Sequence, residues 1–471
     1  LLFSFAGTPY VDLKTDIKSF LPKNLSPKIS RVIINSYLSI LKKNTNLHDK
    51  IEFDLVETCH SFNSQKRLKK KFKKKLLKIY VAALKKVNIH IFKNKLVYKE
   101  IDKINSFEEF INKIKIQKIS PIQKIFFYIK VIKEYGTLPF AGIARVAFIT
   151  QRILLDIKKN KLISNAEYNN FFNNLNLINS EITDDFKKVI KKKMLKKEFI
   201  IKYGHIRPSS YDINSLNFKE NFKNYFTNRD LSSKKIKKNI SFKFKNKLNK
   251  FFINNYKISF TEFLKLAKNS IQYREKAKFI FSKGIDEIFN SLITLGKEVG
   301  ISRKDLAFLD IKNVLNFYTK LEARKLKDAL KDEIKNNKLE FQIMKMIKLP
   351  DVIKSKEDVV LFEETFSKIN FVTSKTLIGE KIELRLDKKN YLNDKIVLIK
   401  NADPGYDFIF NYKIKGLITM YGGSNSHMAI RCLEQDIPAA IGVGNLKYQQ
   451  ILKSKKILLD CNKKKLLGLK N

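Results

Sequence analysis

One stretch near the C-terminal end of the chain, Gly416 to Gly444, constrains the fold most. Its sequence is GLITMYGGSNSHMAIRCLEQDIPAAIGVG. The apolar run Leu417–Thr419 predicts a strand, and the two glycines after it predict a tight turn. The residues from Ser426 or His427 onward predict a helix, and Ala439–Val443 predicts a second strand. The stretch therefore predicts a strand, a turn, a helix and a strand in close succession.

A single histidine, His427, lies where this predicted turn becomes a helix. The glycines before it, Gly422 and Gly423, allow a tight backbone turn that leaves the imidazole exposed. At a helix N-terminus, the unpaired backbone N–H groups and the helix dipole favour a bound anion. Neutral imidazole is also a nucleophile near pH 7. The pattern predicts phosphorylation of His427 and needs room beside the ring, whereas the alternative is a core histidine in an ordinary turn.

The wider pattern resembles the phosphohistidine, or swivelling, domain of the phosphoenolpyruvate-utilising enzymes, whose signature is GG-x-x-S/T-H-x-A-I followed by G-I-P-A. The matching positions are Gly422, Gly423, Ser426, His427, Ala429, Ile430, Glu434, Ile437, Pro438 and Gly442. Asp436 stands where the family usually has Gly, and Leu433 holds the usual Arg site, while Arg431 lies one turn after His427. This departure leaves open which cation steadies the phosphate.

The resemblance implies a catalytic role for His427. It also implies a phosphate loop made of Gly422, Gly423, Ser424, Ser426 and Arg431. The earlier segment NADPGYDFIF, residues 401–410, resembles the one that precedes the active histidine in this family. In that segment, Asp403 followed by Pro404 predicts a helix N-cap.

The positive charge of the chain has two interpretations. The sequence holds 95 Lys and Arg against 46 Asp and Glu, which gives a net charge of +49. Such a charge fits a nucleic-acid-binding protein. However, the basic residues are nearly all Lys, they are spread along the whole chain, and no zinc-finger, RRM or basic-zipper pattern occurs. We therefore expect a field that attracts phosphorylated small molecules, and nucleic-acid binding stays a minor alternative.

Cysteine usage and hydropathy bear on the cellular compartment. Cys59, Cys432 and Cys461 are far apart and lack metal-ligand spacing, which is typical of a reducing cytoplasm. No uninterrupted apolar run reaches the roughly 18 residues of a membrane span, and no signal peptide is evident. We expect a cytoplasmic protein with no membrane partner and no metal site in this chain.

The predicted fold class is α + α/β. Residues 1–347 are expected to form a mostly helical domain, because apolar faces follow start signals such as Ser26-Pro27 and Ser120-Pro121. Residues 348–369 are expected to be a linker. The pattern then changes to the strands FVTSKTLIG, KIELRL, KIVLIK and KILLDC, so residues 370–471 are expected to form a small β/β/α phosphohistidine domain.

Two islands are expected to break the helical region. The first is YGTLPFAGIARVAF, residues 135–148, and the second is YGHIRPSSYDI, residues 203–213. A loop dense in polar side chains and held by Gly and Pro is a common setting for a binding site. The alternative is a structural loop in which Arg207 and Asp212 pair with each other.

The second island resembles a GH-x-R-P-x-x-YD motif in the same family and a related motif in the rifampin phosphotransferases. This resemblance implies binding of a phosphoryl acceptor near both islands. The implied residues are His205, Arg207, Tyr211, Asp212 and Arg145.

The predicted domain order resembles that of the rifampin phosphotransferases, because the histidine domain comes after the helical one. The resemblance implies that ATP and Mg²⁺ are bound by an ATP-grasp domain that precedes Leu1 in a longer protein or belongs to a separate chain. His427 would take a phosphoryl group from ATP and pass it to a small molecule such as pyruvate. The alternative function is a non-catalytic phosphohistidine carrier or regulatory fragment.

Overall fold

The computed structural model of the protein describes residues 2–5, 7–43, 55–56, 74–175, 177–226, 242–243, 245–317, 323–347, 349–350, 352–361, 369–385, 391–423 and 426–469. The chain divides into two compact units, each made of segments distant in the sequence. The first unit comprises Leu1–Ile178, Lys234–Leu295 and Leu309–Lys354. The second comprises Asn179–Ser233, Gly296–Phe308 and Ser355–Asn471. The predicted domain boundaries stay a prediction, and residues 348, 351 and 362–368 of the predicted linker lie outside the described residues.

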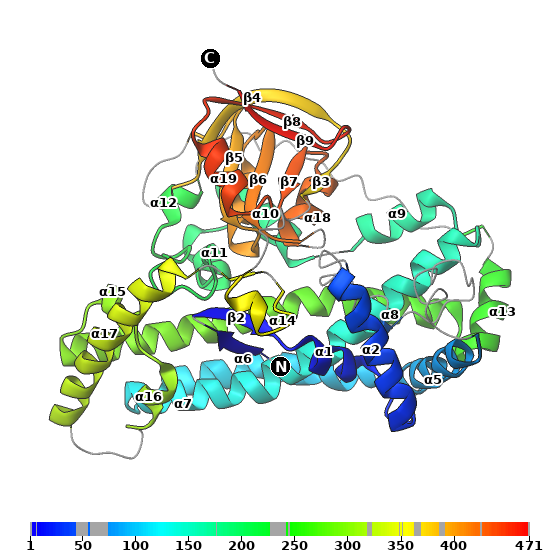
Figure 1. Cartoon of the computed structure of the whole chain (residues 1–471), viewed down its shortest axis with the longest axis horizontal. Helices are drawn as coiled ribbons and strands as arrows, with labels where there is room; N and C mark the ends of the chain where they lie inside the picture. Colours follow the sequence, from blue (N-terminus) through cyan, green and yellow to red (C-terminus); the bar gives the residue numbers. More distant parts are fainter. Residues whose placement is uncertain are drawn as a thin grey trace. The chain divides into compact units, whose positions relative to one another are not determined.

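The first unit is mostly helical, and it begins with a short antiparallel hairpin (Figure 1). Its elements are β1 (Leu2–Phe5), β2 (Thr8–Val11), α1 (Leu13–Phe20), α2 (Pro27–Lys43), α5 (Lys74–Lys93), α6 (Leu96–Ile116), α7 (Pro121–Val131), the π-helical segment η2 (Ile132–Thr137), α8 (Leu138–Lys159), α9 (Asn165–Asn173), α13 (Lys245–Tyr256), α14 (Phe260–Val299), α16 (Ile311–Leu315) and α17 (Ala323–Met346). The large helical region agrees with the predicted fold class.

The predicted helix start signals are confirmed. Helix α2 begins at Pro27, and the Ser26 hydroxyl accepts a hydrogen bond from a backbone N–H of its first turn. Helix α7 begins at Pro121, where Ser120 and Gln123 form a reciprocal capping box. These local signals place the helices without reference to their packing partners.

The first predicted island is not a break, because the chain stays helical from Pro121 to Lys159. Pro139 cannot donate a backbone hydrogen bond, and its ring would clash with a carbonyl of a regular helix. The π-helical segment η2 widens the turn just before it, and the Leu138 N–H reaches back to the Lys133 carbonyl. Gly136 in this segment allows close packing, since a Cβ there would lie 3.0 Å from the Phe107 ring.

This continuous helix bears on the membrane question. By length and composition, the stretch from Pro121 to Lys159 is the one helix among the described residues that could cross a membrane. Half of its most apolar window is buried inside the protein, a property it shares with core helices of soluble proteins. Its length and composition alone therefore do not separate a membrane span from a core helix.

The second unit combines short helices with a mixed sheet. Its elements are α10 (Ile178–Ile190), α11 (Lys196–Tyr203), α12 (Phe222–Tyr225), α15 (Arg303–Leu306), the 3₁₀-helix η3 (Glu357–Val359), β3 (Asn370–Val372), β4 (Thr376–Glu383), β5 (Ile396–Asn401), the 3₁₀-helix η4 (Pro404–Asn411), β6 (Gly416–Tyr421), α18 (His427–Glu434), β7 (Ala439–Ile441), α19 (Asn445–Leu452), β8 (Lys456–Asp460) and β9 (Lys465–Leu469). Strands β5, β6, β7 and β8 overlap the predicted strands. The predicted strands FVTSKTLIG and KIELRL differ from the structure, because β3 takes the start of the first and the single strand β4 joins its end to Lys381–Glu383. β9 is an additional strand.

The seven strands lie side by side in the order β3-β7-β6-β5-β4-β8-β9 (Figure 1). Strands β4, β5, β6 and β7 run parallel to one another, and β3, β8 and β9 pair antiparallel. The central strands are buried on both faces, since Ile396–Ile399 of β5 and Leu417–Met420 of β6 are all buried. Their unbroken apolar runs are typical of parallel strands covered on both sides.

Candidate active site

The sheet topology brings two polar segments to one edge of the sheet. Strands β5 and β6 are parallel neighbours, with Asn401 opposite Tyr421 at their carboxyl ends. The chain enters η4 after β5 and the glycine turn and α18 after β6. In open sheets with parallel strands, ligands bind beyond the carboxyl ends of the strands. Side chains of η4 and of the first turn of α18 therefore meet where a site is expected.

Glycine is required in the turn that leads to α18. Gly422 has a φ of +139°, and a Cβ at this position would lie 2.5 Å from the Cβ of Ala402. Gly442, after β7, has a φ of +71°, and its Cβ would lie 2.3 Å from the carbonyl oxygen of Gly422. Both positions combine a left-handed backbone with a close approach that only glycine permits. The family signature at these two positions thus has a local physical cause.

The predicted helix start is confirmed. Ser426 is the N-cap of α18, and its hydroxyl accepts a hydrogen bond from the Ala429 N–H at 3.4 Å. The Ser426 N–H donates to the Gly423 carbonyl at 3.1 Å, which closes the turn. His427 is the first residue of the helix. Ser424, another residue of the predicted phosphate loop, lies outside the described residues.

His427 forms a buried triad with a carboxylate and a guanidinium. Its Nε2 lies 2.8 Å from Oδ1 of Asp407 in η4. The Nε of Arg431 donates to the same oxygen at 2.8 Å. The side chains of His427, Asp407 and Arg431 are 9%, 6% and 7% exposed. Sequence reasoning did not single out Asp407, although this residue belongs to the segment 401–410 that resembles the one before the active histidine of the family.

The surroundings of Asp407 keep it ionised. Burial by itself raises the pKa of this carboxyl group, but the charge of Arg431 and the hydrogen bonds from His427 and Arg431 lower it more. The net pKa lies below the ordinary value. An ionised carboxylate can only accept hydrogen bonds, so the pair requires a proton on Nε2 of His427.

The prediction of an exposed imidazole with room beside it is wrong for this conformation. The glycine turn does bend as predicted, but the ring points to Asp407 of η4, which covers it. Arg431 is likewise a partner of Asp407 and stacks over the Phe410 ring at 5.3 Å. It therefore holds the carboxylate in the structure described.

A second carboxyl group lies in the same segment. Asp403 is the N-cap of η4, as predicted, and its Oδ1 accepts from the Gly405 N–H at 2.9 Å. Its Oδ2 accepts from the Ser209 N–H at 3.0 Å. Burial raises the pKa of Asp403 to about 6, although the two N–H donors and the nearby His427 act in the opposite direction. The two carboxyl groups of this segment thus have opposite pKa shifts.

The second predicted island, residues 203–213, is a loop between α11 and α12, as expected. It packs against the segment 403–406 within the same compact unit. A Cβ at Gly405 would lie 2.0 Å from the Arg207 carbonyl oxygen, so the two backbones are in close contact. The hydroxyls of Ser209 and Tyr406 are 3.4 Å apart. The structure therefore brings the loop to the segment that carries Asp403 and Asp407.

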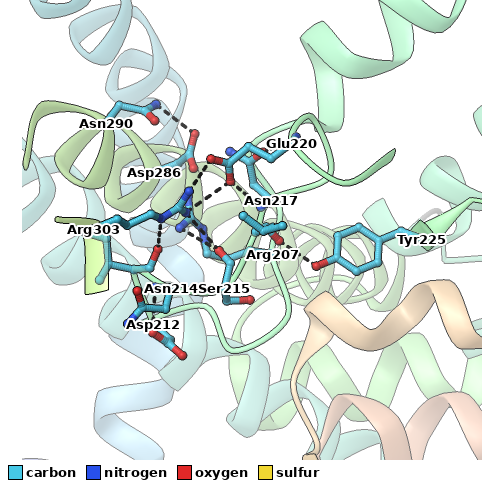
Figure 2. A network of polar contacts seen from close by, with 12 residues as sticks. Arg207, Asp212, Asn214, Ser215, Asn217, Glu220, Tyr225, Asp286, Asn290 and Arg303 are labelled. Atoms are coloured by element: carbon cyan, nitrogen blue, oxygen red, sulfur yellow. Dashed lines mark hydrogen bonds and ion pairs between the residues drawn. The ribbon is translucent and has the colours of Figure 1, made fainter. Parts of the chain in front are cut away.

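The charged residues around the loop hold its backbone (Figure 2). Arg207, which is 4% exposed, donates to the Ser215 carbonyl at 3.2 Å. Arg303 donates to the Ile213 carbonyl at 2.6 Å and forms an ion pair with Glu220 at 2.5 Å. Two arginines thus stabilise main-chain carbonyls of one loop.

The other predicted acceptor residues differ in exposure. His205 is buried, whereas Tyr211 is 77% exposed. Asp212 is exposed and accepts a hydrogen bond from the Asn214 N–H at 2.9 Å. Arg145 belongs to α8 in the first unit, where it donates to the Ser19 carbonyl and stacks over the Phe20 ring at 5.0 Å. The structure therefore groups four of the five residues on one loop.

The segment of the chain that contains the triad matches the model of a known family. Residues 392–464 match the family model of the PEP-utilising enzyme mobile domain. This segment is therefore similar to that mobile domain, and it contains Asp403, Asp407, His427 and Arg431 but not the 203–213 loop. No curated protein matches the chain. A mobile domain of this family suggests phosphoryl transfer through a phosphohistidine.

Among the residues that the structure describes, no group of three or more His, Cys, Asp or Glu side chains could hold a metal ion.

Proposed function

We propose that the protein is a phosphotransferase in which His427 is transiently phosphorylated and passes the phosphoryl group to a small-molecule acceptor. A nitrogen lone pair of the imidazole would attack a phosphorus of ATP. An N–P bond would form, the bond from that phosphorus to the leaving oxygen would break, and the leaving oxygen would depart as part of the phosphate or nucleotide product. In the second step, a hydroxyl or enol oxygen of an acceptor such as pyruvate would take the phosphoryl group from the ring.

One observation carries the proposal. An imidazole at the first position of a capped helix, bonded to an ionised carboxylate, lies within the segment that matches the mobile domain. Phosphoryl transfer depends mainly on positioning and on charge neutralisation, so an imidazole at a helix N-terminus suits it. We further propose that ATP and Mg²⁺ are held by a domain outside this chain.

The acceptor would bind near the 203–213 loop. The contact of Ser209 with Asp403 supports this proposal, because it joins the loop to the segment that precedes His427. Tyr211 and Asp212 are the exposed side chains of the loop and would contact the acceptor. Arg207 and His205 are buried and would hold the loop in shape.

The test uses phosphoramidate, which phosphorylates imidazole without an ATP-binding domain. We expect the wild-type chain to acquire one phosphate that is labile in acid and stable in base, with the phosphorus resonance of a phosphohistidine. The variant His427→Ala should lose it. His90→Asn is the matched control, because His90 is an exposed histidine on α5 and its loss should leave the signal unchanged. Equal phosphate on wild type and His427→Ala would rule the proposal out.

A further inference from the structure

The contact between His427 and Asp407 has a consequence for the reactivity of the ring. A nucleophilic nitrogen needs a free lone pair, which a protonated imidazole nitrogen lacks. Because the pKa of Asp407 is lowered, the carboxylate accepts and Nε2 donates in the 2.8 Å contact. In this conformation, Nε2 therefore has no lone pair with which to attack phosphorus.

The position of Asp407 also excludes the product at this nitrogen. A phosphoryl group bonded to Nε2 would lie along the direction that Oδ1 of Asp407 now occupies. It would also bring negative phosphate oxygens against a negative carboxylate in a buried site, which is unfavourable. Asp407 must therefore move away from Nε2 before that nitrogen can carry a phosphoryl group.

Arg431 sets the strength of this contact. Its Nε donates to the same carboxylate oxygen, so the charge of Asp407 stays compensated while it holds the ring. A hydrogen bond to an ionised acceptor is roughly twice as strong as a neutral one. Since all three side chains are less than one-tenth exposed, solvent screens the interaction little.

We propose that Asp407, supported by Arg431, is a positioning residue that holds His427 in a closed state, and that its release from Nε2 is the step that opens this nitrogen to phosphoryl transfer. This inference rests on the proposed function of His427. It adds a residue and a regulation to the site: Nε2 is held by Asp407 in the closed state and is free to react in the released state.

The first test measures the ring protons directly, by ¹⁵N chemical shifts of the histidine side chains near pH 7.5. In wild type, we expect Nε2 of His427 to be protonated. The variant Asp407→Asn would leave Arg431 buried without its carboxylate, which risks the fold. The double variant Asp407→Asn/Arg431→Gln removes both charges together, and we expect its ring to populate both neutral tautomers. His90→Asn is the matched control, because His90 is an exposed histidine of α5 in the first unit and its loss should leave Nε2 of His427 protonated.

The second test measures the rate at which phosphoramidate labels Nε2 of His427, because NMR separates phosphate on Nε2 from phosphate on Nδ1. The imidazole nitrogen bonds to phosphorus, the P–N bond of the reagent breaks, and ammonia leaves and takes up the ring proton as ammonium. We expect the double variant to react about fivefold to tenfold faster than wild type, the factor for replacing a charge-assisted hydrogen bond by a neutral one. His90→Asn is the matched control and should label His427 at the wild-type rate, because His90 belongs to α5 in the first unit.

The outcomes separate this inference from the proposed function. An unprotonated Nε2 in wild type, or equal labelling rates in wild type and the double variant, would overturn the closed state. If no variant carries phosphate on His427, the proposed function fails, and the ring protonation alone decides whether Asp407 holds the histidine. A protonated Nε2 together with faster labelling of the double variant supports the inference.

Discussion

The histidine site and the 203–213 loop belong to the same compact unit, but their charged side chains are used differently. At the histidine site, Asp407 and Arg431 act on a side chain, the ring of His427. In the loop, Arg207 and Arg303 act on main-chain carbonyls. Both regions are rich in polar residues, so composition does not distinguish them. They differ in what their charged side chains contact, which is a side chain at the histidine site and the backbone in the loop.

The comparison teaches that backbone shape is secured in two ways. The histidine turn relies on glycines whose missing Cβ atoms allow backbones to approach, as at Gly422 and Gly442. The loop relies on the buried Arg207 and the partly buried Arg303, which donate to its carbonyls, since an unpaired buried carbonyl costs about 1–3 kcal/mol. Substitutions in the two regions should therefore fail for different reasons and by different amounts.

The largest effect should come from Gly442→Ala at the histidine turn. The new Cβ adds strain at a φ of +71° and would also lie 2.3 Å from the Gly422 carbonyl oxygen. We expect the free energy of unfolding to fall by about 3 kcal/mol or more, measured by urea denaturation.

Gly300→Ala is the control for the strain alone. Gly300 also has a φ of +71°, but a Cβ there would meet nothing within 4 Å. We expect a loss of about 1 kcal/mol, the cost of a left-handed backbone for alanine. Equal losses in the two variants would show that close approach of the backbones is not what the histidine turn requires.

The next effect should come from Arg207→Met in the loop. Methionine keeps much of the apolar stem but removes the donor to the Ser215 carbonyl. We expect a loss of about 2 kcal/mol and faster hydrogen exchange of the Phe218 and Lys219 amides, which close the loop.

Tyr211→Ala is the control for this loop, because Tyr211 is 77% exposed. It should change stability by less than about 0.5 kcal/mol. If Arg207→Met leaves stability and exchange unchanged but impairs phosphoryl transfer, Arg207 belongs to the acceptor site as the family resemblance implies.

The two regions also differ in how far the sequence predicts them. The strands around His427 and the helix start at Ser426 follow from local patterns, because apolar runs, glycines and a serine cap act over a few residues. The loop at 203–213 follows from Gly and Pro in the same way. The burial of Arg207 does not follow from local patterns, because Arg207 reaches the Ser215 carbonyl only when the loop folds back on itself.

Asp407 shows why the rest of the site could not be predicted. It lies twenty residues before His427, and the two meet only because β5 and β6 pair in parallel with Asn401 opposite Tyr421. No single-strand pattern specifies that register. The burial of the ring could not be predicted either. The glycine turn would leave the imidazole exposed, but Asp407 of η4 contacts it. Pro139 also misleads, because proline predicts a break, whereas the π-helical segment before it lets the helix continue.

The smallest effect concerns Asp403, which joins the two regions through the Ser209 N–H. Burial raises its pKa in the folded protein to about 6, above its value of 3.8 in an unfolded chain. The folded state therefore binds more protons than the unfolded state between these two values. It follows that the contribution of Asp403 to stability is fully present below about pH 4 and is lost as the pH rises through about 6.

Asp403→Asn isolates this contribution, because asparagine is an equally good N-cap but does not titrate. As the pH rises from 4.5 to 7.5, the free energy of unfolding of wild type should fall by about 1 to 2 kcal/mol relative to that of the variant. The melting temperature of the variant should therefore rise relative to that of wild type. Thermal melts of both proteins in matched buffers measure this difference. The contributions of the other titrating groups are the same in both proteins and cancel. A difference independent of pH would mean that Asp403 is ionised throughout. The link between the loop and the histidine segment would then be a permanent charged contact, like the one between Asp407 and Arg431, and the contrast between the two carboxyl groups would disappear.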